Sequence, residues 1–600
     1  MKRLHKMLAG ALAGMMLLTA CSGGGGGTTS GEKEGGDAPK GASVELSTIV
    51  DNEGEPIEGG VLKVGVVLSS PFKGMFNPAL YSGNDDSSIM LPTMWGSFNN
   101  DEDFKLADGG PVSASFDIEA KKATLKIDEK YTWSDGTPVT AADFVYYYKI
   151  IADKDYTGVR YDSDFKNVIG MEEYNAGTAT EISGLEVVDD KTLVINFKEM
   201  HPGILWGGGI PFEPVPAHQL AGIPVKDLES SDAVRKNPLS CGPYYISEVV
   251  PGEKVLFKAN EHFWRGKAHI PELVMEVVSP DVVAEAVKAG KYDIVVDSYP
   301  ADKYDQIKDL NNIKIVGRPG YVYNYVGFKL GKWDAKKGQV VPDPKAKMAD
   351  VNLRLAMGHA LDMQAMSDNL YFGLRSPANS LIPPPFKNFH TDNPNAILFD
   401  KEKAIKILDD AGYVDTDKDG FRETPTGEKL QINVATMSGG DLGENLALFY
   451  TQAWQEIGLD AVLATGRTIE FNAFYEKVQA DDPGIDVFMG AWSTGSNPEP
   501  SGLYGREAQF NYSRYASEEL DQILADINSV KAFDDAFRKD AYHRFEEYMI
   551  KNAPVVPIQY RTMLRTVNNR VKSYDWSYYG TEYSTWADLQ LTAPEPIAHK

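Results

Sequence analysis

The chain has 600 residues, of which 42% are hydrophobic, and this length exceeds what one hydrophobic core usually holds, so we expect two or more lobes. It carries 86 Asp and Glu against 60 Lys and Arg. The formal net charge of −26 argues against nucleic-acid binding, because such a surface repels phosphate backbones. The two cysteines, Cys21 and Cys241, do not provide a disulfide framework for a chain of this size.

Residues 1–20 have the pattern of a signal peptide. Three basic residues open the chain, and residues 7–18 are apolar but too short to span a bilayer. The run Leu18-Thr19-Ala20-Cys21 resembles a bacterial lipobox, before whose cysteine the chain is cut. The resemblance implies that Cys21 carries a diacylglycerol and anchors the protein to the outside of the cell membrane. The alternative is a soluble secreted protein with a chance cysteine at the cleavage site.

Residues 21–60 have a composition that cannot bury a core. Five consecutive glycines, at 23–27, are followed by Thr, Ser, Gly and mixed charges. This predicts a flexible tether. The folded chain is expected to begin with an apolar, buried strand at residues 61–68.

A strand, a tight turn and a helix are predicted over residues 125–151. Leu125 and Ile127 alternate with polar residues, as in a half-buried strand, and Ser134-Asp135-Gly136 is typical of a tight turn. Thr140 is the expected N-cap of the helix, and Asp143 would complete a capping box. Taken alone, this pattern indicates an ordinary packed unit without chemistry.

The same stretch carries a more specific signal. Trp133-Ser134-Asp135-Gly136, followed by Pro138 and Asp143-Phe144, resembles the signature of the peptide/nickel family of ABC-transporter solute-binding proteins. Further motifs of that family follow in its order at residues 241–244 (CGPY), 260–264 (NEHFW) and 290–294 (GKYDI). Residues 376–384 (SPANSLIPP) are similar to a string of the oligopeptide-binding lipoproteins of lactic acid bacteria.

The resemblance covers residues 59–591 and implies an α/β, two-lobed periplasmic-binding-protein-like fold. The implied type is class II, with a three-part architecture and a ligand cleft between the lobes. The core of lobe I is expected at 61–95, 216–322 and 557–600, with an extra domain at 96–215. Lobe II is expected at 323–556. The chain should cross between the lobes near 321–328 and return near 553–558.

Catalytic motifs are absent from the sequence: it contains no HExxH, GxSxG or Walker A pattern, and its nine histidines are scattered. This argues against the alternative class, a lipid-tethered extracytoplasmic hydrolase, and predicts that the protein is not an enzyme. The resemblance implies a monomer that captures oligopeptides and delivers them to the permease subunits of an ABC transporter without a cofactor. Other ligands stay open, namely a nickel complex, a glycan, haem or a signalling peptide, because this scaffold is reused.

One acidic loop is a candidate metal site. Asp415, Asp417 and Asp419 alternate, and carboxylates at every second position can converge on a hard cation. The Phe421 carbonyl and Glu423 would be further ligands. The run resembles the first half of an EF-hand loop, although the acid of the twelfth position is missing. The sequence predicts a structural calcium ion here, and the alternative is an Asp- and Gly-rich turn.

The ligand-binding candidates come from the resemblance. Ala491, Trp492 and Ser493 match a segment that offers its backbone to the peptide in this family, as to an added strand. Such β-augmentation binds through main-chain hydrogen bonds whatever the side chains. Weaker candidates are three tyrosines near the lobe crossings, for which core packing is the alternative: Tyr321, Tyr323 and Tyr560.

One departure from the family concerns the peptide's α-amino group. In enteric relatives an Asp shortly after the matching Trp pairs with this group, and Gly495 stands at that place here. The departure implies that the amino terminus of a peptide is held loosely.

Overall fold

The computed structural model describes residues 44–600 except 69, 95, 297–298, 439–441 and 578–585. The described residues belong to one compact unit, 42–600. The predicted signal peptide, Cys21 and the first part of the predicted tether lie outside them. None of the described helices is long and apolar enough to cross a membrane.

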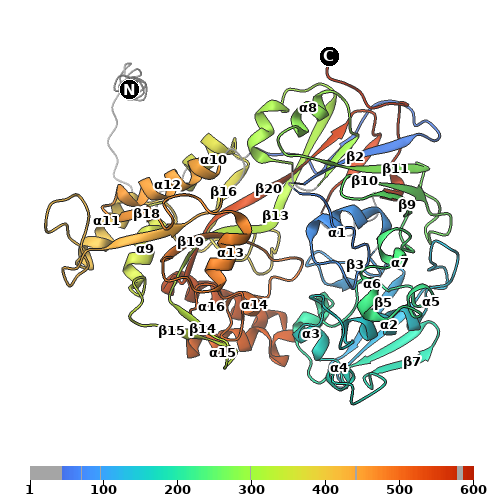
Figure 1. Cartoon of the computed structure of the whole chain (residues 1–600), viewed down its shortest axis with the longest axis horizontal. Coiled ribbons are helices and arrows are strands. Elements are labelled where there is room, and N and C mark those ends of the chain that lie inside the picture. The colour runs from blue at the N-terminus through green and yellow to red at the C-terminus, as the bar shows by residue number, and fades with distance from the viewer. Residues whose placement is uncertain (1–43, 69, 95, 297–298, 439–441, 578–585) are drawn as a thin grey trace, which may run out of the picture. The chain divides into compact units, whose positions relative to one another are not determined.

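One mixed sheet of eleven strands organises the described chain. Its middle is formed by two long antiparallel strands, β13 (Ile313–Phe328) and β20 (Val555–Asn568), which lie side by side in Figure 1. The predicted crossings at 321–328 and 553–558 fall on these two strands. On one side the sheet continues through β12 (Ile294–Val296), β2 (Val61–Val67), β11 (Glu272–Val278), β10 (Lys254–Ala259) and β9 (Tyr244–Val250). On the other side it continues through β19 (Val487–Ser493), β17 (Gln431–Ala435) and β18 (Asp460–Leu463), while β16 (Arg375–Pro377) pairs with β20.

The unit predicted around residues 125–151 is confirmed. The helix α2 (Ala141–Ile151) follows the predicted turn, and the Asp143 carboxylate accepts a hydrogen bond from the Thr140 backbone N–H at 2.8 Å. The same carboxylate accepts a hydrogen bond from the Ala217 N–H at 2.9 Å, so it also fixes a distant segment. The helix packs near a four-stranded antiparallel sheet, whose order is β5 (Val112–Asp117), β6 (Lys122–Ile127), β8 (Thr192–Asn196) and β7 (Leu185–Asp189).

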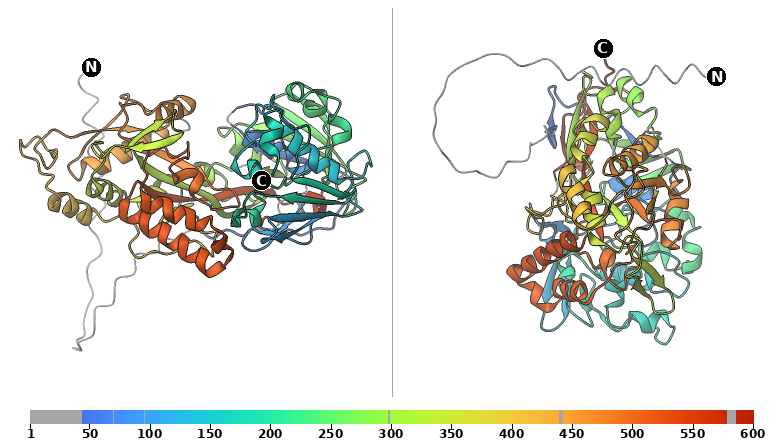
Figure 2. Two further views of the ribbon diagram at one scale, coloured as in Figure 1. Left: turned by 90° about the horizontal axis from the view of Figure 1, so that it is seen from below. Right: turned by 90° about the vertical axis from the view of Figure 1, so that its left-hand side faces the viewer.

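Helices cover the part of the sheet that contains β19. A first apolar cluster joins α9 (Val351–His359), α11 (Lys401–Asp410) and α12 (Gly443–Gln455) to the strands. A second cluster contains α13 (Phe471–Gln479), α15 (Glu518–Ile527) and α16 (Asp535–Asn552). Figure 2 shows α15 and α16 packed together as an orange-red pair. Both helices contribute buried residues to this cluster, such as Leu524 and Phe545.

The remaining elements are short. The helices are α1 (Asn84–Met90), α3 (Ser163–Lys166), α4 (Met171–Asn175), α5 (Ala217–Leu220), α6 (Val225–Leu228), α7 (Asp232–Arg235), α8 (Val283–Lys288), α10 (Met363–Leu370) and α14 (Ser501–Tyr504), with 3₁₀ turns η1 (Leu91–Thr93), η2 (Pro202–Trp206), η3 (Ala301–Gln306) and η4 (Val530–Phe533). Two-stranded pairs are formed by β3 (Asn99–Asn100) with β4 (Leu106–Ala107), β14 (Gly331–Asp334) with β15 (Gln339–Pro342), and β1 (Ile49–Asp51) with β21 (Ser573–Asp575).

The end of the predicted tether is folded, which corrects the boundary at residue 60. Strand β1 pairs with β21, Val50 is buried in a core cluster, and the Ile57 N–H donates to the Leu591 carbonyl at 2.8 Å. These partners lie at the other end of the sequence. A composition argument sees only neighbouring residues, so it could not detect them.

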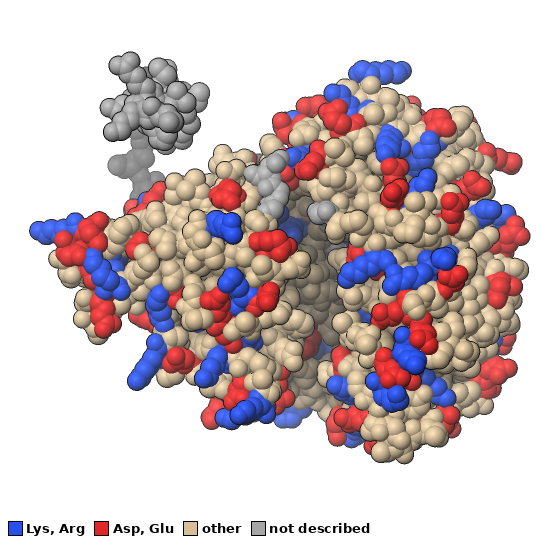
Figure 3. Space-filling view, viewed as in Figure 1, with Lys and Arg blue, Asp and Glu red and all other residues tan. Residues whose placement is uncertain are grey.

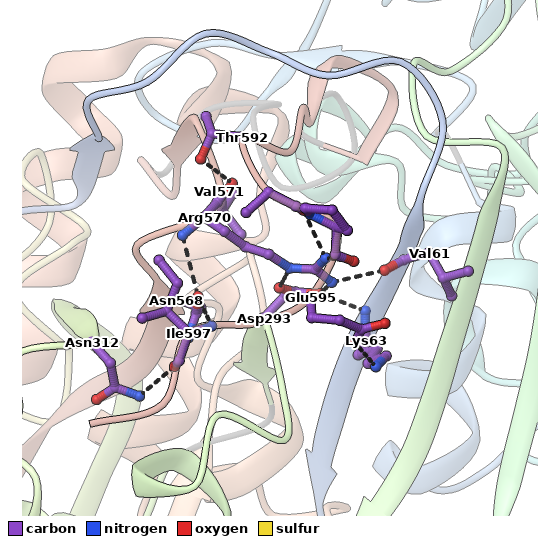
Figure 4. A network of polar contacts seen from close by, with 12 residues as sticks. Val61, Lys63, Asp293, Asn312, Asn568, Arg570, Val571, Thr592, Glu595 and Ile597 are labelled. Atoms are coloured by element: carbon purple, nitrogen blue, oxygen red, sulfur yellow. Dashed lines mark hydrogen bonds and ion pairs between the residues drawn. The ribbon is translucent and has the colours of Figure 1, made fainter. Parts of the chain in front are cut away.

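A fully buried ion pair joins four segments near the C-terminus (Figure 4). The Arg570 guanidinium contacts both oxygens of Asp293, at 2.5 and 2.6 Å, and both side chains are inaccessible to solvent. Arg570 also donates to the Val61 carbonyl at 2.9 Å and the Ala593 carbonyl at 3.0 Å. The second Asp293 oxygen accepts a hydrogen bond from the Lys63 N–H at 2.8 Å. The pair therefore ties the starts of β2 and β12 to the C-terminal residues.

Removing the Asp293 charge should destabilise the fold strongly. We expect Asp293→Asn to lower the free energy of unfolding by about 3–5 kcal/mol, because it leaves a buried guanidinium without its counter-charge. Denaturant melts followed by tryptophan fluorescence measure this. The matched control is Glu595→Gln, which removes an exposed partner of Lys63 and should leave the melt close to that of the parent. Equal melts for Asp293→Asn and the parent would contradict the role of the pair.

Candidate functional site

Strand β19 presents a backbone edge that no described strand covers. On one side β19 pairs with β13 over its whole length. On the other side β17 reaches only Val487 and Phe488. The segment from Met489 to Ser493 therefore has one open edge among the described strands.

The alternation of hydrogen-bonded pairs between β19 and β13 shows which backbone groups of β19 face this edge. The Thr494 N–H donates to the Tyr321 carbonyl at 2.9 Å, and hydrogen-bonded pairs alternate along an antiparallel ladder. Trp492 thus exchanges its backbone bonds with β13, whereas the N–H and C=O groups of Ala491 and Ser493 point to the open edge. The Tyr475 side chain contacts the Ala491 backbone at this edge. An extended chain that replaces Tyr475 there can pair with the edge as an additional strand.

Trp492 supports the strand from one face of the sheet. Its half-buried indole stacks on the rings of Tyr325, at 6.4 Å between centroids, and Tyr512, at 5.5 Å. Phe510 meets it edge-on at 5.6 Å. These contacts hold the strand in place beside its open edge.

The face of the molecule seen in Figure 3 is deeply hollowed in the middle. Two cavities lie at the C-terminal end of β19 and share Tyr81 and Met94 in their walls. The first, of about 510 Å³, is lined by residues of the loop after β19, such as Ser496 and Asn497, and by residues 206–213. The second, of about 270 Å³, is lined by Ser493 and Tyr321 among others. Together they provide room for several residues of a ligand.

The three predicted tyrosines lie in different surroundings. Tyr321 is half-buried and lines the second cavity. Tyr323 is 1% exposed, and its hydroxyl lies 2.6 Å from that of Tyr504. Tyr560 is buried as well, and its hydroxyl bonds the Ser380 N–H at 2.9 Å and the Ser380 carbonyl at 2.8 Å. The structure therefore brings Tyr321 to the cavity wall, and it places Tyr323 and Tyr560 in the packed interior beside it.

Comparison with known proteins identifies the family. Residues 113–513 match the family described as bacterial extracellular solute-binding proteins, family 5. The chain belongs to this family. The oligopeptide-binding protein OppA of Lactococcus lactis subsp. cremoris is 32% identical over 507 residues, covering 83% of this chain and 84% of that protein. The oligopeptide-binding protein AppA of Bacillus subtilis is 24% identical, with coverages of 82% and 85%.

Solved structures agree with this assignment. Lactococcal OppA, complexed with an endogenous peptide in the closed conformation, superimposes with a TM-score of 0.77 at 31% identity. The match covers 89% of this chain and all of that chain. The family resemblance and the α/β two-lobed fold predicted from the sequence are thus confirmed. The chain is a solute-binding protein and not an enzyme.

Acidic residues of a distant segment reach the first cavity of this family 5 protein. Asp162 and Asp164 line it together with Arg160, and Ser496 and Asn497 line the same cavity. Burial raises the pKa of Asp164, and the His201 ring lies 3.6 Å from its carboxylate. In the sequence, Glu499 is the only carboxylate near the loop after Trp492. Proximity between residues 160–164 and that loop has no local signal, so sequence reasoning missed these groups.

The predicted metal ligands lie in an exposed loop that already contains a cation. Ligand atoms of Asp415, Asp417 and Asp419 lie within 4.8 Å of one another. The Lys429 ammonium contacts Asp417, lies 2.5 Å from Asp419, and lies 3.4 Å from Glu423. Hydrogen bonds to Asp417 and Asp419 raise the pKa of Lys429.

Other donors also occupy this loop. Glu423 accepts hydrogen bonds from the Thr416 N–H and hydroxyl, both at 2.7 Å, and the Phe421 N–H donates to Asp419 at 2.9 Å. A calcium ion would have to replace Lys429 among these oxygens. The structural calcium ion stays a prediction.

The surroundings of Tyr560 include a buried carboxyl group. Glu546 on α16 is 3% exposed and accepts hydrogen bonds from the hydroxyls of Ser380 and Thr391. Burial is the main reason that the pKa of Glu546 rises to about 7. The Ser380 backbone in turn bonds the Tyr560 hydroxyl, so this group connects α16 to strand β20.

Glu546 should make the stability of the protein depend on pH. Its pKa is raised in the folded state, so its contribution is complete below about pH 4.5 and is lost as the pH rises through about 7. The loss amounts to about 3 kcal/mol, to order of magnitude. Glu546→Gln should lack this part of the pH dependence, whereas the exposed neighbour variant Glu547→Gln should keep it. Urea melts at pH 5 and pH 7.5 test this, and identical pH dependence in Glu546→Gln and the parent would refute it.

Proposed function

We propose that this protein captures oligopeptides outside the cytoplasmic membrane and delivers them to the permease of an ABC transporter. The observation that carries the proposal is the open backbone edge of β19 at Ala491 and Ser493, beside two cavities. The names of the similar proteins, which are oligopeptide-binding proteins, support it.

Binding through the edge would depend on the peptide backbone. A peptide strand paired with Ala491 and Ser493 gains main-chain hydrogen bonds that any sequence can make. The cavities then hold side chains, in part through water. Main-chain hydrogen bonds for affinity and loosely fitting cavities for side chains suit a protein that binds many different peptides. It also distinguishes the proposal from binding of nickel complexes, glycans or haem, which have no alternating backbone donors and acceptors.

The mode of binding predicts an alternating response to backbone methylation. Peptides that co-purify with the protein are identified by mass spectrometry, and one is resynthesised with a single N-methyl group at successive positions. Methylation of an N–H that faces Ala491 or Ser493 should lower the affinity about tenfold or more. Methylation removes the hydrogen bond from the peptide N–H, and it leaves the carbonyl of Ala491 or Ser493 without a donor. The next residue along, whose N–H faces away, is the matched control.

Calorimetry measures these affinities. A uniform effect at all positions would contradict pairing with β19. A co-purified glycan, haem or nickel complex in place of peptides would contradict the proposed ligand class itself.

We further propose that Cys21 is lipidated and holds the monomeric protein at the outer face of the membrane. The support is the lipobox-like run at Leu18-Thr19-Ala20-Cys21 and the Gly-rich stretch after it. An anchored binding protein stays near its permease, so a captured peptide has a short path to the transporter.

Replacement of the anchor should release the protein. Cys21→Ala should move it from the membrane fraction to the medium or to a soluble extracytoplasmic fraction, because no acyl chains remain to insert into the bilayer. Fractionation followed by immunoblotting measures this, and Cys241→Ala is the matched control, since Cys241 is buried in the folded protein. Retention of Cys21→Ala on carbonate-washed membranes would show that the anchor lies elsewhere.

A further inference from the structure

Two arginines of this acidic protein lie opposite each other in the sheet, with no counter-ion from the described part of the chain. Arg375 of β16 and Arg561 of β20 are direct cross-strand partners, so their side chains leave the same face of the sheet. Like charges placed in this way are destabilising. Neither guanidinium has a carboxylate within 4.0 Å among the described residues. Asp302 acts on Arg375 only from beyond ion-pair distance.

The neighbours of the two guanidiniums satisfy only part of their donors. Arg561 donates from Nε to the Asn324 side-chain oxygen at 2.9 Å, and Arg375 donates from Nη1 to the Gln559 side-chain oxygen at 3.2 Å. The Arg375 guanidinium also lies 3.8 Å above the Tyr371 ring. The Arg375 Nε and the Gln559 Nε2 are buried donors without an acceptor in the described structure, and Gln559 is 1% exposed.

Two guanidiniums with an unsatisfied donor and with no counter-charge among the described residues form a site that a carboxylate ligand would fit. Buried donors normally have partners, because leaving one unsatisfied costs free energy. A carboxylate offers two oxygens to the fork of a guanidinium, and it would supply both missing acceptors and a counter-charge. Burial lowers the pKa of both arginines, and the charge of Arg375 further lowers that of Arg561, to about 10. Both arginines are half-buried as residues.

The pair lies on the same sheet face as part of the proposed peptide edge. Gln559 is opposite Asn324, and Asn324 is opposite Ala491, so β20, β13 and β19 are successive neighbours. A peptide strand paired with the open edge lies one spacing beyond β19, so three strand spacings, about 14 Å, separate it from β20. About five extended residues span this distance. Tyr475 of α13 lies near both ends of this path. Burial raises its pKa, whereas the charge of Arg561 and the backbone of Ala491 act in the opposite direction.

We propose that Arg375 and Arg561 bind a carboxylate of the peptide whose backbone pairs with Ala491 and Ser493. This inference rests on the proposed function and adds a selectivity element to it. The carboxylate comes from the C-terminus of the peptide or from an Asp or Glu side chain. In either case the ligand supplies the negative charge that no described residue provides within ion-pair distance of the two arginines.

The experiment uses three pools of synthetic nonapeptides built from Ala, Ser, Leu, Tyr and Lys. The first has a free C-terminal carboxylate, the second is C-terminally amidated, and the third is amidated but carries one Glu in the middle. Each pool is offered to the full chain freed of co-purified peptide, and the captured amount is measured by mass spectrometry. The variants are Arg375→Gln and Arg561→Gln, and the matched control is Arg467→Gln, an exposed arginine of the loop between β18 and α13.

We expect the parent and Arg467→Gln to bind the free-acid pool, the Glu pool or both at least tenfold more tightly than the amidated pool. The preferred pool identifies the source of the carboxylate. In Arg375→Gln and Arg561→Gln this preference should fall to threefold or less. The inference is overturned if both variants keep the parent's preference, or if the parent binds all three pools equally. A parent that captures no peptide at all would instead overturn the proposed function, and this inference with it.

A stability measurement separates ligand binding from a structural role. Without peptide, each single variant should melt at the parent's temperature or above it, because one of two facing like charges has been removed. A fall in melting temperature together with an unchanged preference would mean that the arginines only support the fold. Arg561→Lys gives a second test. It keeps the charge but loses the planar fork, so its preference should lie between those of the parent and Arg561→Gln.

Discussion

The antiparallel pairing of β13 with β20 is the constraint on which the rest of the structure depends. These two strands belong to distant parts of the sequence, yet together they form the middle of the sheet from which both halves extend. Their register shifts twice, between Pro319 and Tyr323 and between Asn324 and Tyr325. Irregularities of this kind bend and twist a strand pair locally. They lie where Tyr321 borders the cavity and where β19 pairs with β13, so bending there would move the proposed binding edge relative to the cavity walls.

Two pairs of buried or half-buried charged residues differ in whether their charges are neutralised within the protein. Asp293 and Arg570 neutralise each other within hydrogen-bond distance, and the surrounding carbonyls satisfy the remaining guanidinium donors. Arg375 and Arg561 face each other with amide oxygens as partners, and no carboxylate of the described residues lies at ion-pair distance. Complete pairing is what a structural charge requires, because an uncompensated one is costly. A charge that binds a ligand must instead lack a counter-ion in the protein, because the ligand then supplies it.

A protein that binds peptides by pairing with their backbone gains affinity that does not depend on the amino-acid sequence of the peptide. Selectivity then comes from the few groups around the edge that recognise something other than the main chain. In the proposed mode of binding, the aromatic contacts of Trp492 keep the edge in position, and the charged groups of the cavity walls favour ligands of opposite charge. Because fold alone does not fix the ligand, these groups decide between the solutes that the scaffold can accept.

Local and family-specific features could be predicted from the sequence. The capping box of Thr140 and Asp143 depends on residues three positions apart, and the family signature is a matter of order along the chain, so both were predicted correctly. Ala491 to Ser493 were singled out by resemblance alone, and their open edge became visible only when the end of β17 was known.

The tertiary structure alone decided the rest. It placed the hydroxyls of Tyr323 and Tyr560 in internal hydrogen bonds, and it brought Lys429 into the acidic loop. It folded residues 49–51 against β21, carried Asp164 to the loop after β19, and set Arg375 opposite Arg561. Each of these contacts joins residues that no local pattern relates. The contact of Lys429 with Asp419 spans ten residues, and the others arise from strand pairing and loop closure over long sequence separations, which depend on how the whole chain packs.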